Sequence, residues 1–276
     1  MQAAILQLNV SDDPVANLAV TREMFRAAVA DGAQFVLTPE VTNCVSTSRK
    51  HQQEVLQFEE EDITLAALRD EAKAAGVWLL IGSLGLKTGD ADRRFANRSF
   101  VIGPDGAVVA KYDKIHMFDV QISETETWRE SEGYRPGDQA VLAQTDFAKI
   151  GMSVCYDVRF SQLYRALAIA GADILTVPAA FSPVTGAAHW HALLRARAIE
   201  SGCFVIAPAQ TGTHASETNK TRDTYGHSLV VDPWGEVILD AGTTSGVYKF
   251  DLDMKKGEAA RRRVPSLANA RDFSGP

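Results

Sequence analysis

Three residues of complementary chemistry follow predicted strands at separate points of the chain. Glu40 comes directly after the apolar run 35–39, Lys114 ends a predicted hairpin, and Cys155 ends the apolar run 149–154. A thiol that attacks a carbonyl needs a base for its proton and a positive group for the oxyanion. An isolated Glu or Lys is usually solvated and a free cysteine is usually an inert buried residue. Three complementary groups at equivalent positions favour nucleophilic catalysis.

The segment around Cys155 is predicted to be a strand that runs into a helix. Its first half contains Gly and β-branched residues, and Leu163, Leu167 and Ala170 then share one helical face. A helix N-terminus favours a negative charge, so we expect Cys155 to be exposed and easily deprotonated. The pattern Gly-x-Ser153-x-Cys155 only partly resembles a nucleophile elbow, because Ser153 lies inside the strand; we predict that Ser153 is structural.

Helices alternate with strands in both halves of the chain. The predicted helices begin after Asp13, at Asp62, after Cys155 and at His189, and the predicted strands cover 3–10, 35–39, 77–82, 98–102, 108–112, 149–154, 174–177, 204–207, 228–231, 237–239 and 247–251. Residues 119–140 and 211–222 are polar and lack periodicity, so we expect surface loops there. Without a Pro/Ser-rich linker, this pattern favours one α/β domain with mixed sheets.

Composition excludes several classes of protein. A formal net charge of −7 over 276 residues argues against nucleic acid as a partner. The three cysteines are too few for a disulfide framework, and we find neither a signal peptide nor an apolar run long enough to cross a membrane, so we expect a soluble cytoplasmic protein. Dinucleotide, P-loop and zinc motifs are missing, and the histidines lack the spacing of metal ligands. We therefore expect no metal and no organic cofactor. The basic run 261–263 indicates a solvated helix end or a subunit contact.

Several segments resemble the motifs of one known family. They are Leu37-Thr38-Pro39-Glu40, Lys111-Tyr112-Asp113-Lys114-Ile115-His116 and Gly151-Met152-Ser153-Val154-Cys155-Tyr156-Asp157-Val158-Arg159-Phe160. In this order they resemble the three motifs of the nitrilase superfamily of carbon–nitrogen hydrolases. The resemblance extends from Ala3 to about Phe273, and segments 181–190, 194–200 and 225–235 make it closest to the Nit-type amidases.

The resemblance implies a fold and a set of roles. The fold would be an αββα four-layer sandwich of two stacked mixed sheets with helices outside, formed by a single domain over 1–276. Glu40 would be the general base, Cys155 the nucleophile, and Lys114 with the Tyr156 N–H the oxyanion site. Such proteins commonly form homodimers or higher homo-oligomers, and we expect the tail 252–276 to lie in subunit contacts.

Further site residues follow from the same resemblance. The family adds a second glutamate before a Pro-Gly pair, here Pro136-Gly137, and both Glu130 and Glu132 precede it. The spacing of Glu130 matches the Nit-type pattern better, although a carboxylate in so charged a region is ordinarily solvated. Arg159 resembles the arginine that binds a substrate carboxylate, and Thr185, in the loop after strand 174–177, adds a hydroxyl. Each has a structural alternative, Arg159 in an ion pair and Thr185 in a turn.

The implied reaction is hydrolysis of a small carboxylate-bearing amide through a cysteine thioester. The segment Ala207-Pro208-Ala209-Gln210-x-Gly212 resembles the deaminated-glutathione amidases more than the omega-amidases that act on α-ketoglutaramate. A nitrilase and a catalytically silent scaffold remain alternatives, as does a papain-like pairing of Cys155 with His189. We predict that Cys44 and Cys203 are packing residues.

Overall fold

Two six-stranded mixed sheets form the centre of the molecule, which is described by a computed structural model over residues 1–122, 124, 126–217 and 221–275. The first sheet has the strand order β16-β1-β2-β3-β4-β5. Its strands are β1 (Gln2–Gln7), β2 (Phe35–Leu37), β3 (Trp78–Lys87), β4 (Phe95–Ile102), β5 (Val108–Asp113) and β16 (Gly246–Asp251). The second has the order β15-β14-β11-β10-β9-β8. Its strands are β8 (Val141–Gln144), β9 (Lys149–Met152), β10 (Ile174–Thr176), β11 (Phe204–Ala207), β14 (Leu229–Val231) and β15 (Val237–Asp240).

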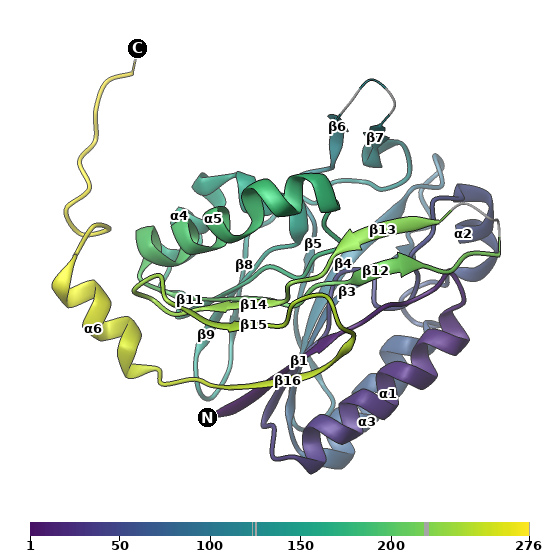
Figure 1. The fold of residues 1–276 in the computed structure, drawn as a ribbon, viewed down its shortest axis with the longest axis horizontal. Helices are drawn as coiled ribbons and strands as arrows, with labels where there is room; N and C mark the ends of the chain where they lie inside the picture. The colour runs from purple at the N-terminus through teal and green to yellow at the C-terminus, as the bar shows by residue number, and fades with distance from the viewer. Residues whose placement is uncertain (123, 125, 218–220, 276) are drawn as a thin grey trace.

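The sheets pack face to face and helices cover their outer faces. Strand β1 shows why: Ala3 and Ile5 pack in the core with residues of the second sheet, whereas the alternate residues Ala4 and Leu6 pack with the helices of the first. Figure 1 shows the helices on opposite sides of the sheets. They are α1 (Pro14–Ala30) and α3 (Ile63–Ala75) on one side, and α4 (Ser161–Ile169) and α5 (Pro183–Ser201) on the other. The predicted four-layer sandwich is confirmed.

Local signals placed the first helices correctly. Asp13 caps α1, because its carboxylate accepts hydrogen bonds from the N–H groups of Val15 and Ala16, and Pro14 occupies the first turn. Asp62 caps α3 in the same way, and α3 ends at Gly76, whose φ of 65° is left-handed. In both helices, residues that cap or terminate the helix stand just where the apolar helical pattern begins or ends.

Two predicted loops contain hairpins. The stretch 119–140 holds β6 (Asp119–Gln121), β7 (Thr127–Arg129) and the 3-10 turn η1 (Glu130–Glu132), and 211–222 holds β12 (Thr211–His214), which pairs with β13 (Arg222–Tyr225). Residues 123, 125 and 218–220 of these stretches lie outside the described part. The loop prediction was wrong because these short strands bury few residues, none of them apolar, so pairing rather than hydrophobic alternation defines them.

Three other elements differ from prediction. The segment after Cys155 is the 3-10 turn η2 (Cys155–Arg159) followed by α4, and α5 begins at Pro183, six residues before the predicted start. The helix α2 (Arg49–Val55) was not predicted, since its seven residues are almost entirely polar. The early start of α5 places Thr185 in the first helical turn instead of a loop, so that correction changes the site.

The C-terminal part holds α6 (Lys255–Arg263), and the basic run 261–263 forms its last turn. Of the two predicted roles for this run, a helix end or a subunit contact, the structure shows the helix end. The guanidinium of Arg263 lies 3.8 Å from the ring centre of Trp234. Figure 1 shows the residues after α6 extending away from the sheets. Within the described residues, none of the helices combines the length and apolar character that a membrane crossing requires.

Candidate active site

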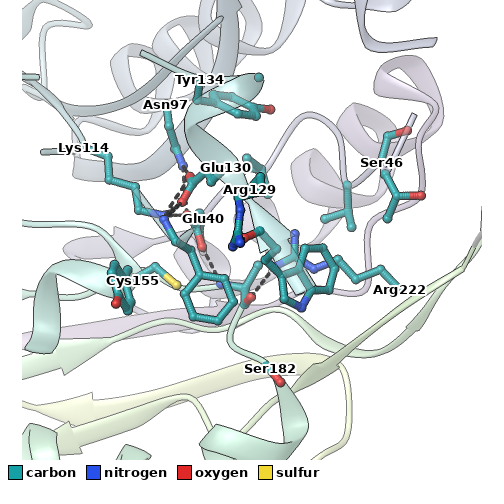
Figure 2. A pocket seen from close by; sticks show the side chains of 18 of the residues that line it. Glu40, Ser46, Asn97, Lys114, Arg129, Glu130, Tyr134, Cys155, Ser182 and Arg222 are labelled. Atoms are coloured by element: carbon teal, nitrogen blue, oxygen red, sulfur yellow. Dashed lines mark hydrogen bonds and ion pairs between the residues drawn. The ribbon is translucent and has the colours of Figure 1, made fainter. Parts of the chain in front are cut away.

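A cavity of about 290 Å³ opens where strands of both sheets end, and Figure 2 shows its side chains. Glu40 follows β2, Lys114 follows β5 and Cys155 follows β9; all three line this cavity. Strands β2 and β5 belong to the first sheet and β9 to the second, and packing of the two sheets brings their ends together. The structure therefore unites the three residues that the sequence analysis selected.

Glu40 is held by donors from both sheets. Its Oε2 accepts a hydrogen bond of 2.7 Å from the Ala180 N–H, and its Oε1 accepts one of 2.8 Å from Asn97 Nδ2 and one of 3.0 Å from Lys114 Nζ. Burial raises the pKa of this carboxyl, but the charges of Lys114 and Arg222 outweigh it, and the pKa lies below its ordinary value. Glu40 is thus an ionised carboxylate in a site that is almost closed to water.

Lys114 is an ammonium between two carboxylates. Its side chain is 2% exposed, and its Nζ donates at 2.8 Å to both oxygens of Glu130 in addition to Glu40. Burial opposes the charged form, yet Glu130 and Glu40 raise the pKa of Lys114 well above its ordinary range. An ammonium has three N–H donors. If one N–H is shared by the two Glu130 oxygens and a second binds Glu40, the third is available for another acceptor.

Glu130 and Glu132 both line the cavity, and their contacts differ. The Glu130 carboxylate binds Lys114 and also accepts a 2.6 Å hydrogen bond from the Phe118 N–H. No hydrogen bond joins the Glu132 carboxylate to Lys114 among the described contacts; its backbone carbonyl accepts one from Arg49. The geometry therefore separates the two candidates that the sequence left open.

Cys155 occupies a tight turn, with a φ of 51° that non-glycine residues seldom adopt. A 2.8 Å hydrogen bond from its N–H to the Pro178 carbonyl holds this backbone. Burial and the charge of Glu40 raise the pKa of Cys155 well above its ordinary value, although Lys114 acts in the opposite direction. The expectation of an exposed thiol at a helix N-terminus was wrong, because Cys155 is 7% exposed and α4 begins six residues later. The raised pKa favours the neutral form of the thiol.

Asp157 ties the Cys155 turn to the residues on either side of Lys114. Its carboxylate is fully buried; Oδ2 accepts from the Val154 N–H (2.8 Å) and the Tyr112 hydroxyl (2.7 Å), and Oδ1 from the His116 N–H (3.0 Å) and ring Nδ1 (2.7 Å). Sequence reasoning missed this role, although Tyr112, His116 and Asp157 stand inside the recognised motifs. Ser153 is structural as predicted, since its Oγ binds the Thr176 carbonyl at 2.7 Å.

Tyr156 and Thr185 line the cavity beside Cys155. The Tyr156 N–H lies in the first turn of η2 and has no acceptor among the described residues. The buried Oγ1 of Thr185 and Oγ of Ser182 also lack hydrogen-bond partners within the described part. Buried polar atoms in folded proteins are nearly always paired, so these three groups are candidates for polar contacts on this side of the site.

Arg159 lies outside the lining of the cavity. Its guanidinium is 5.8 Å from the ring centre of Tyr156 and 5.5 Å from that of Phe181, and its Nη1 lies 3.3 Å from His189 Nδ1. The structure therefore places Arg159 behind two lining rings, and it joins His189 to Arg159 instead of to Cys155. No described contact joins His189 to Cys155 as the papain-like pair would require, and the binding of a substrate carboxylate by Arg159 stays a prediction.

Three arginines that sequence reasoning missed line the cavity instead: Arg49, Arg129 and Arg222. No sequence pattern singled them out, since each stands in a polar stretch that tertiary packing folds over the cavity. Asn97, the amide donor to Glu40, was missed for the same reason. Its Oδ1 is another buried atom without a partner among the described residues.

Histidines far apart in the sequence meet elsewhere on the surface. His191 Nε2 lies 2.9 Å from an Asp240 oxygen, as does His227 Nδ1, and all three ligand atoms lie within 4.8 Å of one another. Spacing in the sequence does not reveal this group, because α5, β15 and the segment before β14 bring its members together. Their mutual hydrogen bonds already satisfy the three groups.

The remaining cysteines are buried thiols. Burial raises the pKa of Cys44 to about 12, and Asp12 adds to the effect. Cys44 lines the outer part of the cavity, whereas Cys203 packs against the Ala172 carbonyl, 3.1 Å from its Sγ. These surroundings suit packing residues.

Comparisons with known proteins agree with this geometry. Residues 2–262 match the family model for carbon-nitrogen hydrolase. The chain is 36% identical over 272 residues to the deaminated glutathione amidase of Yersinia enterocolitica, covering 98% of this chain and 93% of that protein. It is 33% identical to the omega-amidase NIT2 of Homo sapiens, with 97% and 94% covered. The NitFhit crystal structure from C. elegans superposes with a TM-score of 0.90 at 32% identity, covering 98% of this chain and 65% of that one, so this chain spans about two thirds of NitFhit. The chain belongs to the carbon–nitrogen hydrolase family.

Proposed function

We propose that this protein is an amidase that hydrolyses a small carboxylate-bearing amide through a thioester on Cys155. The observation that carries the proposal is the contact of one buried ammonium, Lys114, with the carboxylate of Glu40 inside the cavity that holds the thiol. Buried ion pairs add little net stability, so their presence at a cavity with a nucleophile points to chemistry.

In the first half-reaction, Glu40 takes the Cys155 proton while Sγ forms a bond to the amide carbon. The carbonyl electrons move to oxygen, and the Lys114 ammonium and the Tyr156 N–H stabilise this oxyanion. The tetrahedral intermediate then collapses: the C–N bond breaks, Glu40 returns its proton to the nitrogen, and an amine or ammonia leaves. The acyl group remains on sulfur as a thioester.

In the second half-reaction, Glu40 removes a proton from water and the resulting hydroxyl attacks the thioester carbon. The same oxyanion donors act again, the C–S bond breaks, and the proton on Glu40 returns to sulfur. Glu130 has a positioning role, since both its oxygens hold the Lys114 ammonium where the carbonyl oxygen arrives. The neutral resting thiol suits this scheme, because its proton is transferred only as the C–S bond forms.

Deaminated glutathione is the substrate we favour, with α-ketoglutaramate as the alternative. Proteins named for each activity are 36% and 33% identical to this chain. Both compounds carry a 2-oxo carboxylate on the acyl side. The unpartnered hydroxyls of Ser182 and Thr185 at the start of α5 suit that carboxylate, with Arg159 behind the lining rings adding positive charge.

The decisive experiment compares both amides and a simple nitrile at equal enzyme concentration. We expect kcat/KM to be highest for deaminated glutathione, and intact-mass measurements to detect the acyl group on Cys155. Cys155→Ala and Glu40→Gln should lose turnover, whereas Cys203→Ala, another buried thiol distant from the cavity, and His189→Ala should retain it. Retained turnover in Cys155→Ala would refute the mechanism, and a protein that turns over none of the compounds would be the silent scaffold.

The two glutamates and the arginine behind the rings have separate tests. Glu130→Gln should lower kcat strongly, while Glu132→Gln, its matched control in the same turn, should not; the reverse result would reassign the role. Arg159→Ala should raise KM for a carboxylate-bearing amide. An unchanged KM would remove Arg159 from substrate binding.

We also propose that the chain acts as a single-domain homo-oligomer in the cytoplasm, with residues 252–276 in subunit contacts. Support comes from Val264 and Phe273, which are apolar residues 56% and 89% exposed in this tail, and from the three unpaired cysteines, which suit a reducing compartment. Light scattering should give a mass above that of one chain, and deletion of 265–276 should lower it. A monomer at micromolar concentration would contradict the proposal.

A further inference from the structure

Among the described residues, none of the three cavity arginines forms an ion pair with a carboxylate. Each guanidinium donates to backbone carbonyls: Arg49 to Glu132 and Asp92, Arg129 to Trp128 and Val120, and Arg222 to Ala180. No carboxylate of a described residue lies within ion-pair distance of any of them. Most other buried or half-buried charges of the site are neutralised, as Lys114 is by Glu40 and Glu130. The arginines thus add three positive charges to a lining whose other charged side chains are those of Lys114, Glu40, Glu130 and Glu132.

Arg222 is the best placed of the three. It is half-buried in β13, its Nη2 donates at 2.6 Å to the Ala180 carbonyl, and its guanidinium lies 5.0 Å from the ring centre of Trp128. The backbone contact and the ring hold the guanidinium in one orientation while leaving other N–H groups available. A fixed guanidinium of this kind suits two-point binding of a carboxylate.

The position of Arg222 determines which part of a substrate it meets. The Ala180 residue that binds Arg222 also donates its N–H to Glu40, so Arg222 stands next to Glu40. Figure 2 shows Lys114 and Cys155 on one side of Glu40 and Arg222 on the other. In the tetrahedral intermediate the oxygen points to Lys114 and the leaving nitrogen to Glu40, which protonates it. Groups attached to that nitrogen therefore extend past Glu40 toward Arg222.

We infer that Arg222 binds a carboxylate on the leaving-group side of the substrate, so that the cavity selects amides of small peptides with a free C-terminal carboxylate over primary amides. This inference rests on the proposed amidase function and deepens it. Arg129 also lines the cavity and adds positive charge, and the Trp128 ring beside the Arg222 guanidinium covers the peptide part. Deaminated glutathione, which releases a dipeptide ending in glycine, has this chemistry; α-ketoglutaramate, which releases ammonia, does not.

Three substrates with one acyl group give a sharp test. They are α-ketoglutaramate, deaminated glutathione, and the analogue of the latter whose terminal carboxylate is a carboxamide. All three form the same thioester on Cys155, so deacylation is identical and kcat/KM compares acylation alone. Arg222→Gln should lower kcat/KM for deaminated glutathione about 10- to 100-fold more than for its carboxamide analogue, the range of one charge-assisted pair. Arg222→Lys should restore part of the difference.

Comparison within each variant removes indirect effects. Arg222 also lowers the pKa of Glu40, so Arg222→Gln changes the base, but this affects both substrates equally and cancels in their ratio. Arg135→Gln is the matched control, because Arg135 pairs with Asp90 outside the cavity lining; its ratio should equal that of the wild type. Equal losses on carboxylate and carboxamide substrates in Arg222→Gln would overturn the inference. Absence of any turnover by the wild type would instead refute the amidase proposal.

Discussion

The substitution Asp157→Asn tests whether one buried carboxylate aligns the nucleophile with the oxyanion site. Asp157 accepts four hydrogen bonds, two from the Cys155 turn and Tyr112 at Oδ2 and two from His116 at Oδ1. Asparagine keeps one acceptor oxygen, and its NH2 group must face two donors on the other side. At least two charge-assisted bonds are then lost inside a fully buried site.

The expected cost follows from these contacts. Each hydrogen bond to a charged group contributes about 1.5–3 kcal/mol, so the loss of two destabilises Asp157→Asn by about 3–6 kcal/mol. The same change frees the Cys155 turn from the segment that carries Lys114. A displacement of about 1 Å at a reacting centre costs about 100-fold in rate, so kcat should fall by about that factor while KM changes little.

Urea unfolding and steady-state kinetics measure the two effects separately. Tyr112→Phe is the matched control: it removes one of the four donors and leaves the carboxylate, so it should cost about 1.5–3 kcal/mol and less than about tenfold in kcat. Asp157→Asn with stability within about 1 kcal/mol of the wild type would refute the energetic reasoning. Lost stability with unchanged kcat would show that Asp157 supports the fold without aligning the site.

Three further predictions concern charge and packing. Burial raises the pKa of Glu40, but the neighbouring Lys114 ammonium lowers the pKa by more, so its net position is below the ordinary 4.5. The acid limb of the pH–kcat/KM profile should therefore lie below pH 4.5, and a limb near pH 6 would contradict this. Burial lowers the pKa of His214 to about 4 from 6.5, so its contribution to stability is complete above pH 6.5 and is lost as the pH falls toward 4. The loss should reach about 3 kcal/mol in urea unfolding and vanish in His214→Gln. Gly186→Ala places a Cβ 2.3 Å from the Tyr225 ring and should destabilise the protein by about 1–3 kcal/mol, whereas Gly257→Ala, with its nearest atom at 3.6 Å, should not; equal melting temperatures would exclude the clash.

Local chemistry explains what was predictable about the fold. Asp13, Asp62 and Gly76 mark helix ends because each satisfies or terminates backbone groups within a few residues of itself. Strands with an apolar run, such as β2 and β11, were found because burial requires such residues. The polar hairpins β6–β7 and β12–β13 were missed, since their strands bury no apolar residues and are defined only by pairing with each other.

By itself the sequence determined the order of most elements, the motifs of Glu40, Lys114 and Cys155, and through them the family. Only the tertiary structure decided the electrostatics of the site. Glu40 binds Ala180, 140 residues away, and the thiol pKa is raised because packing of two sheets buries Cys155 beside that carboxylate. Arg222 reaches the cavity through a hairpin that the sequence pattern did not show. Burial and distance set these properties, and both depend on residues that are far apart in the chain.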